Sequence, residues 1–539
     1  MTTTRRLAAS VAAVSLLLAA CGGDGEDGGD GDAAGQNGAA ATGGELRAYL
    51  SEPDSLIPSA ATDSESNQVV TEIYRGLTVN AMDGGAELAV AESIESDDNI
   101  TWTVRLKEGY SFTNGEPVDA DAFIRGWNYA AYGPNAQDGA GFFERFVGFD
   151  EVQADPPEAE ELSGLTKVDD YTFTVELTAP FAGFREVVAY QVFAPLAEEC
   201  LADVDACNEL PISNGPYQLE SPWEHDVQVV LVRNEDYPGE DAGFADRIVF
   251  RIFESEDAAY AAFVGGELDI IDQVPAERRP EAQAQYPDGY FQTPNNSFTY
   301  LGMPDYDERF SDVRLRQAFS LAIDRQAIID AALGGTPRPA SGWVSPLFDG
   351  QRDGVCEYCH YDPDEAKRLF DEAGGWDGTL ELMANAGAGH ETWLQALGDQ
   401  LKQNLGIEYT INANQQFAEY LATLENQEAI GPYRLGWGPD YALMETYLTH
   451  LYGTNQSSNY FGYSNLEFDD LLKQGDSAAT VEEAIGFYQR AEDVLAEDMV
   501  AVPLWWGTQD VLYNPDTVAE LAFNAIDYED YGQTMLQQN

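Results

Sequence analysis

The chain has 539 residues, of which 95 are acidic and 27 are basic, so its formal net charge is -68 at pH 7. This acidic balance excludes nucleic acid as a partner, because two polyanions repel each other. At about 100 to 200 residues per domain, the part after residue 44 is too long for one hydrophobic core and predicts two or three domains. The acids are spread along the whole sequence, and their mutual repulsion would strain a compact fold at low salt. In ~1 M salt this repulsion is screened within about 3 Å, so we expect a saline habitat.

The N-terminus has the features of an export signal. Arg5 and Arg6 precede an apolar run that is too short to span a bilayer as a mature helix. The run ends in Leu-Ala-Ala-Cys at residues 18–21, which resembles the lipobox of bacterial lipoproteins, whose cysteine receives a lipid and becomes the first mature residue. We therefore expect residues 1–20 to be a signal peptide, and a lipid on Cys21 to hold the protein on the extracytoplasmic face of the cell membrane. The alternative is an ordinary secretory signal that ends near a cysteine.

Residues 21–44 predict a flexible acidic linker. After Cys21 the segment is almost entirely Gly, Ala, Asp, Glu, Asn, Gln and Thr, a composition that cannot bury a hydrophobic core. As a flexible coil, such a segment has an end-to-end distance of roughly 25 Å. It would hold a folded body just off the membrane.

The first half of the body predicts several strands and one well-marked helix. Residues 46–50 form a short apolar run that ends in a turn-rich loop, and residues 101–107 alternate strictly between apolar and polar side chains, as a half-buried strand does. Asp119 is placed to cap a helix that follows. Further strands are expected at residues 171–177 and 227–232.

The second half predicts longer helices. One is expected from Ser311 to the glycine pair that begins at Gly334, and another begins after Asp362, which is placed to cap it. Thr480 is the expected cap of a helix that reaches about Ala496. Strands and helices mixed in this way, without strict alternation, indicate an α/β protein with several sheets.

The cysteines of the body form two pairs that are close in sequence. Cys200 lies near Cys207, and Cys356 lies near Cys359, so two local disulfides are the expectation for an exported chain. The second pair and His360 also match the haem attachment pattern C-x-x-C-H. Haem is the weaker interpretation, because the pattern lies in a loop sequence without an evident apolar pocket. We expect no cofactor and no metal site.

Eight segments of the body, in this order, resemble one known family. They are EPDSLIP at 52–58, IYRGL at 73–77, WTVRLKEGYSFTNGEPVDADAF at 102–123, ISNGPYQL at 212–219, GGELDI at 265–270, VRLRQAFSLAIDR at 313–325, YDPDEAKRLFDEAGG at 361–375 and GWGPDY at 436–441. The family is that of the extracytoplasmic solute-binding proteins of bacterial ABC importers, the oligopeptide-binding or family 5 group. The resemblance covers nearly everything from Glu45 to the C-terminus.

This resemblance implies an α/β, periplasmic-binding-protein-like fold of type II, in the large cluster, with two lobes around a deep cleft and an extra smaller α/β domain. The expected domains are lobe I over 45–88, 210–296 and 506–539, an inserted smaller domain over 89–209, and lobe II over 297–505. Closing of the two lobes over a ligand is a hinge motion, and a membrane permease can recognise the closed state.

The resemblance also implies a ligand site around GWGPDY. In peptide-binding relatives the aspartate that falls here on Asp440 holds the charged amino end of the peptide, through a charge-assisted hydrogen bond. Arg434 lies where a relative can use arginine near the peptide's carboxyl end. The alternatives are that Asp440 caps a helix starting near Tyr441 and that Arg434 is an exposed strand residue. The other expected cleft residues are Trp437, Gly436, Ser51, Glu52 and Asn214.

The function implied is a lipid-anchored receptor that captures peptides and delivers them to an ABC transporter permease with its cytoplasmic ATPases. We expect a monomer that is not an enzyme. One alternative keeps the fold but carries a nickel complex, a sugar or another small solute. The alternative from another class is a secreted hydrolase, for which the sequence offers neither a G-x-S-x-G elbow nor an H-E-x-x-H zinc site.

Overall fold

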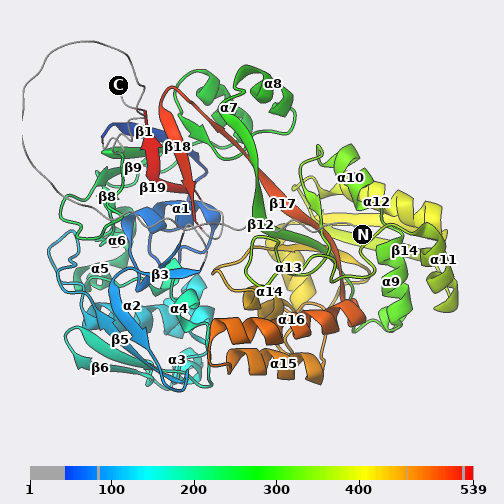
Figure 1. The fold of residues 1–539 in the computed structure, drawn as a ribbon, viewed down its shortest axis with the longest axis horizontal. Coiled ribbons are helices and arrows are strands. Elements are labelled where there is room, and N and C mark those ends of the chain that lie inside the picture. The colour runs from blue at the N-terminus through cyan, green and yellow to red at the C-terminus, as the bar shows by residue number, and fades with distance from the viewer. Residues whose placement is uncertain (1–42, 82–84, 457, 525–528, 538–539) are drawn as a thin grey trace, which may run out of the picture. The chain divides into compact units, whose positions relative to one another are not determined.

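The computed structural model describes residues 43–81, 85–456, 458–524 and 529–537. The predicted signal peptide, Cys21 and nearly all of the linker lie outside the described residues. Within the described part of the chain, no helix combines the length and the apolar character that a membrane span requires. The architecture is α/β, with several sheets and helices around them, as predicted (Figure 1).

The largest sheet has 11 strands and joins distant parts of the sequence. In sheet order its main path is β15 (Glu408–Gln415), β14 (Thr379–Asn385), β16 (Tyr433–Trp437), β12 (Tyr290–Gly302), β17 (Ala501–Tyr513), β11 (Ile270–Ile271), β1 (Glu45–Leu50), β10 (Arg247–Ile252), β9 (Gln228–Arg233) and β8 (Tyr217–Leu219), and β13 (Arg338–Pro339) pairs with β17. The smaller sheets are β4 (Ala91–Glu95), β5 (Thr101–Leu106), β7 (Thr172–Glu176) and β6 (Leu165–Asp169); β2 (Thr78–Asn80) with β3 (Ala86–Leu88); and β18 (Val518–Phe523) with β19 (Glu529–Leu536).

The helices fall into those before and those after β12. The first group is α1 (Ser64–Ile73), α2 (Ala120–Ala131), α3 (Phe149–Gln153), α4 (Phe184–Val187), α5 (Glu198–Ala202), α6 (Val204–Glu209), α7 (Glu256–Val264) and α8 (Arg279–Gln285). The second group is α9 (Val313–Leu321), α10 (Arg325–Ala332), α11 (Pro363–Glu372), α12 (His390–Leu405), α13 (Phe417–Glu425), α14 (Glu445–Tyr452), α15 (Leu466–Asp476) and α16 (Val481–Asp498).

Strands β12 and β17 connect the two halves of the large sheet. Each has 13 residues, and they run antiparallel along their whole length (Figure 1). The pairing is interrupted between Pro294 and Phe298. On one side of this interruption β17 also pairs with β11, and on the other side β12 also pairs with β16. The interruption therefore lies where the ladder passes from one half of the sheet to the other.

The sheet of β4 to β7 confirms the predicted pattern of residues 101–107. Trp102, Val104 and Leu106 are buried on one face, while the residues between them are more exposed. Asp119 caps α2 as predicted, since its carboxylate accepts the backbone N–H of Ala122 at 3.0 Å. The aromatic side chains that pack around Trp127 of α2 are Phe123, Phe143, Phe146, Phe173 and Phe193.

Of the three helices predicted in the second half, two are confirmed and one is wrong. Asp362 caps α11 and Thr480 caps α16. The single helix expected from Ser311 to Gly334 is instead two helices, α9 and α10. The break occurs because Asp324 starts a new helix by accepting the N–H of Ala327 at 3.0 Å.

Both cysteine pairs are disulfide-bonded in the structure. The bond between Cys200 and Cys207 joins α5 to α6, and the bond between Cys356 and Cys359 lies in the loop before α11. Because the two sulfurs of the second pair are bonded to each other, this pair has no thiol left for attaching a haem.

An ion-pair network joins the segment before α3 to helices α14 and α15. Arg145 donates to Glu445 at 2.8 Å and to Asp476 at 2.9 Å, and its guanidinium lies 4.2 Å from the ring centre of Phe181. The Glu445 side chain is fully buried. Asn99 adds a hydrogen bond of 2.6 Å to the carbonyl of Ala478. This network ties the predicted inserted domain to predicted lobe II. The boundaries of both domains stay a prediction.

We predict that Arg145→Met lowers the free energy of unfolding by about 3–5 kcal/mol, because it leaves the buried Glu445 carboxylate without its cation. Urea unfolding followed by circular dichroism measures this change. The double variant with Glu445→Gln should recover part of the loss, since no buried charge then remains unpaired at that position. Equal stability of wild type and Arg145→Met would show that the network contributes nothing to folding.

Candidate functional site

The candidate site is a cavity of about 450 Å³ at the interruption between β12 and β17. Residues 295–297 of β12 and residues 508–510 of β17 form one wall. Other parts of the lining come from α1, from residues 272–274 after β11, from the first residue of α8, and from the pair Gly438 and Pro439. The cavity therefore collects polar residues from segments that are far apart in the sequence.

The parallel pairing of β1 with β11 and β10 explains why one wall is rich in functional groups. Ligand sites in α/β sheets lie beyond the carboxyl ends of the strands. Asp272 follows the carboxyl end of β11 and lines the cavity. It accepts a hydrogen bond of 3.1 Å from the side-chain amide of Gln68 in α1, and burial raises its pKa to about 6.

Asp510, on the wall formed by β17, is held by three partners. It forms an ion pair of 2.7 Å with Arg279, and it accepts hydrogen bonds from Tyr290 at 2.5 Å and from Gln292 at 2.8 Å. The charges of Asp510 and Arg279 thus offset each other. Both residues line the cavity, so the pair fixes the position of α8 relative to β17.

The GWGPDY segment begins at the end of β16, and its first two residues lie on opposite faces of that strand. In a strand, alternate residues share a face, so Arg434 and Gly436 lie on one face and Trp437 lies on the other. A side-chain carbon at Gly436 would lie 3.3 Å from the Arg434 guanidinium, so glycine leaves room for this arginine. Trp437 stacks on His450 of α14, with ring centres 6.0 Å apart.

Asp440 lies beside the cavity with its side chain only partly exposed. Pro439, its neighbour in the chain, lines the cavity. Burial raises the pKa of Asp440 to about 6, although the charge of His450 and a hydrogen bond from Tyr190 act in the opposite direction. Asp440 is thus a carboxylate whose ionised form is destabilised by the protein, and a cationic ligand group would stabilise it.

The structure does not support the alternative that Asp440 caps a helix near Tyr441. The next helix, α14, begins at Glu445, and Met444 is its N-cap residue. Tyr441 instead donates a hydrogen bond of 2.6 Å to Glu445, and its hydroxyl lies 3.1 Å from the Nε2 atom of His450. Asp440 therefore lies in a loop that these contacts hold in place.

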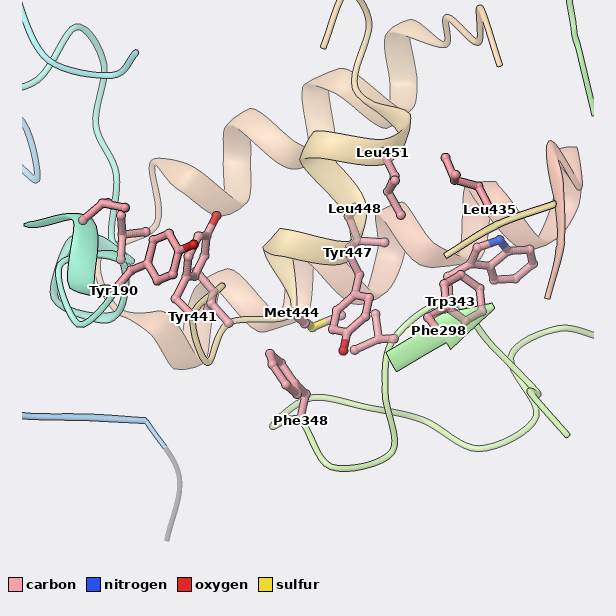
Figure 2. Packing of buried hydrophobic residues seen from close by; sticks show 14 of the residues in the cluster. Tyr190, Phe298, Trp343, Phe348, Leu435, Tyr441, Met444, Tyr447, Leu448 and Leu451 are labelled. Carbon is pink, nitrogen blue, oxygen red and sulfur yellow. The ribbon is translucent and has the colours of Figure 1, made fainter. Parts of the chain in front are cut away.

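Helix α14 is also tied to the interrupted strand. The hydroxyl of Tyr447 donates a hydrogen bond of 2.6 Å to the backbone carbonyl of Asn296. Figure 2 shows Tyr447 packed with Phe348, and their ring centres are 5.3 Å apart. The helix that follows Asp440 is thereby attached to the residues that line the cavity.

Arg434 is a largely buried cation. Its Nε atom has no hydrogen-bond partner among the residues that the structure describes. Burial lowers its pKa, and burial together with the nearby Arg434 charge lowers the pKa of His390 to about 4. Arg434 does not line the cavity described above, so its role toward a ligand stays a prediction.

Three other predicted cleft residues differ in their surroundings. Ser51 lies in a hollow next to the cavity, and the two share Glu256 and Gln273. Glu52 instead contacts His225 at 2.7 Å and accepts the backbone N–H of Asp226 at 2.9 Å. Neither hollow includes it.

Asn214 is a buried structural residue and lines neither of these hollows. Its side chain accepts the backbone N–H of Arg75 at 3.1 Å and donates to the carbonyl of the same residue at 2.9 Å. A side-chain carbon at the next residue, Gly215, would lie 2.5 Å from the backbone of Ile73. The ISNGPYQL segment therefore packs against the end of α1, which corrects the prediction that Asn214 is a cleft wall.

Several lining residues were not predicted from the sequence, namely Gln68, Asp272, Arg279, Asn295 and Asp510. A local signal existed only for Asp272, which directly follows β11 and lies where ligand-binding residues are common. Among the described residues, no three side chains of metal-binding type are grouped as a metal ion requires.

The chain matches the family model described as bacterial extracellular solute-binding proteins, family 5 middle, over residues 86–459. It is 26% identical over 478 residues to the periplasmic oligopeptide-binding protein OppA of Salmonella typhimurium, covering 86% of this chain and 87% of that protein. It is 27% identical over 494 residues to the dipeptide-binding protein DppE of Bacillus subtilis, covering 88% and 89%.

Solved structures show the same fold. The unliganded open form of the periplasmic murein tripeptide-binding protein MppA is matched with a TM-score of 0.77 and 24% identity, over 93% of this chain and 98% of that one. Listeria monocytogenes OppA bound to peptide is matched with a TM-score of 0.70 and 24% identity, over 93% and 100%. The fold is thus the predicted two-lobe, type II binding-protein fold. With the family model matched over most of its length, the chain belongs to the family 5 bacterial extracellular solute-binding proteins.

Proposed function

We propose that this protein is a lipid-anchored receptor that captures peptides in the cavity region and delivers them to the permease of an ABC importer. It would act as a transport receptor and not as an enzyme. One observation carries the peptide assignment: Gly438 and Pro439 line the cavity at the interruption between β12 and β17, and Asp440 is the next residue of the chain.

The chemistry of a peptide end fits this position. A free amino terminus carries a positive charge near neutral pH, and its removal from water is costly unless an anion replaces the lost hydration. Asp440 supplies such an anion through a charge-assisted hydrogen bond. Relatives named as oligopeptide-binding and dipeptide-binding proteins support this cargo class.

The polar cavity fits the rest of a peptide. Amide side chains at residues 68, 273, 295, 296 and 509 line it, and such groups both donate and accept hydrogen bonds. Main-chain N–H and C=O groups are shared by every peptide, so contacts of this kind hold peptides of different sequence. Arg434 is the proposed partner of the carboxyl end.

Anchoring and delivery rest on the N-terminal sequence and on the family. The predicted lipid on Cys21 and the acidic linker would keep the receptor close to the membrane in which its permease lies. Hinge closing of the two lobes would present the loaded form to the permease, whose cytoplasmic ATPases drive transport. The proposed domain division is the one expected from the sequence, with a smaller domain inserted into lobe I.

The cargo prediction is tested in two steps. Mass spectrometry of the ligand released from protein purified without refolding should identify short peptides. After unfolding and refolding to remove cargo, calorimetry should show that Asp440→Ala weakens binding of a peptide with a free N-terminus by about 10- to 100-fold, the effect of losing a charged hydrogen bond. Asp288→Ala, which removes an exposed carboxylate outside the cavity, is the matched control. Equal binding of N-terminally blocked and free peptides would refute the role of Asp440.

Peptide affinity should also fall as the pH is lowered. With a pKa of about 6, the ionised fraction of Asp440 drops from about nine-tenths at pH 7 to about one-tenth at pH 5, while a terminal ammonium stays protonated. Binding of a peptide without ionisable side chains should therefore weaken about tenfold over this range. Calorimetry at both pH values tests this, and Asp440→Asn should abolish most of the pH dependence. An unchanged pH profile in that variant would assign the effect to another group.

The anchor is tested in cells that export the protein. Cys21→Ser should move the mature protein from the membrane fraction to the soluble fraction, because no lipid can then be attached. Fractionation followed by immunoblotting measures the distribution, and serine at Cys200 and Cys207 is the control for loss of cysteines elsewhere. Retention of Cys21→Ser protein on the membrane would contradict lipid anchoring at this residue.

A further inference from the structure

We propose that the cavity beside Asp440 binds the positively charged side chain of a lysine or arginine residue of the cargo, with Asp272 as its carboxylate partner. This inference rests on the proposed function and narrows it, because it makes peptides with a basic residue the preferred substrate class. The basic side chain is a second positive group of the peptide, separate from the amino end assigned to Asp440.

Asp272 is a buried carboxylate with one oxygen that is not hydrogen-bonded, which is suited to binding a cation. The residue is only 4% exposed and lines the cavity. Its Oδ2 atom accepts the hydrogen bond from Gln68, whereas its Oδ1 atom is buried and has no hydrogen-bond partner among the described residues. Buried polar atoms are normally paired, so an unpaired carboxylate oxygen at a cavity wall points to a missing donor.

The position of this carboxylate is fixed by its neighbours. Asp272 directly follows β11, which is hydrogen-bonded between β1 and β17. Gln68 is oriented by the buried Tyr531, whose hydroxyl donates to the Gln68 side-chain oxygen at 3.3 Å, so that the Gln68 nitrogen is directed to Asp272. A carboxylate held in this way loses little further freedom when a ligand cation binds.

The charges on the cavity wall favour a cation. Four carboxylates line it, at Glu256, Asp272, Asp510 and Glu529, against one guanidinium at Arg279, so the formal sum is 1 minus 4, or -3. The guanidinium is already paired with Asp510. Asp272 forms no ion pair with a lysine or arginine among the described residues, and Glu256 is close enough to Asp272 for their charges to repel. A lysine or arginine side chain of the ligand would relieve this repulsion.

The cavity also has a suitable size and position. Its volume of about 450 Å³ lies within the range of pockets that hold small ligand groups. Because Pro439 belongs to the lining, a peptide whose amino end is at Asp440 has the cavity directly beside it. The high overall acidity of the protein does not explain the site, since a buried carboxylate with an unpaired oxygen differs from a solvated surface acid.

The test compares charged and neutral side chains of similar shape. Calorimetry on the refolded, ligand-free protein uses tripeptides in which lysine is replaced by norleucine, or arginine by citrulline, at each position in turn. We expect the charged peptide to bind about tenfold more tightly than its neutral partner at one position or more. In Asp272→Asn this ratio should fall to about one, while the affinity for the norleucine peptide stays within about twofold.

Two further variants make the test specific. Glu267→Gln removes an exposed carboxylate that does not line the cavity, and it should keep the wild-type ratio. Glu256→Gln removes a second carboxylate that lines the cavity, and it should lower the ratio about twofold or more. If circular dichroism shows that Asp272→Asn does not fold, the ratio measured for Glu256→Gln replaces it as the test of the inference.

The possible failures are distinguishable. If the wild-type protein binds none of the peptides, the proposed function is overturned and the inference falls with it. If peptides bind but charged and neutral partners bind equally at every position, the peptide function stands and the inference is wrong. The inference is also overturned if folded Asp272→Asn, or Glu256→Gln in its place, keeps the wild-type ratio.

Discussion

The interrupted pairing of β12 with β17 is the constraint on which the rest of the structure depends. These two strands carry the hydrogen-bonded ladder from the half of the sheet that contains β1 to the half that contains β16. Between Pro294 and Phe298 the regular register is lost, and residues 295–297 of this irregular stretch line the polar cavity. The same pair of strands thus joins the two halves of the sheet and lines the binding site. A hinge between the proposed lobes would have to pass through these two strands.

Electrostatics divides the acidic groups into two kinds. Glu445, Asp476 and Asp510 are buried or partly buried beside arginines that offset their charge, and they hold elements together. Asp440 and Asp272 have no such arginine partner in the described part of the chain, and burial raises the pKa of each to about 6. Carboxylates of the second kind are destabilised in their ionised form until a cation arrives, which is the property that a receptor for positively charged groups needs.

Local features of the sequence were sufficient for the elements whose causes are local. The alternation at residues 101–107 and the caps at Asp119, Asp362 and Thr480 lie within a few residues of the structures they specify. The break between α9 and α10 also has a local signal, the cap at Asp324, but apolar residues on both sides of it favour one continuous helix. Arg325 turns its guanidinium inward to the carbonyl of Pro503, 178 residues away in sequence, and that contact is not visible in the helix itself.

By itself, then, the sequence determined the family, the α/β class, the disulfide pairs and the segment that carries Asp440, since each of these depends on short motifs or on residues close in the chain. Only the tertiary structure decided which polar groups share one cavity. Gln68, Asp272 and Asp510 come from three elements separated by more than 200 residues at each step. It also decided that Asn214 supports α1 instead of facing a ligand. The physical reason is that burial, which sets both the pKa of a carboxylate and its need for a partner, is created only when these distant segments pack together.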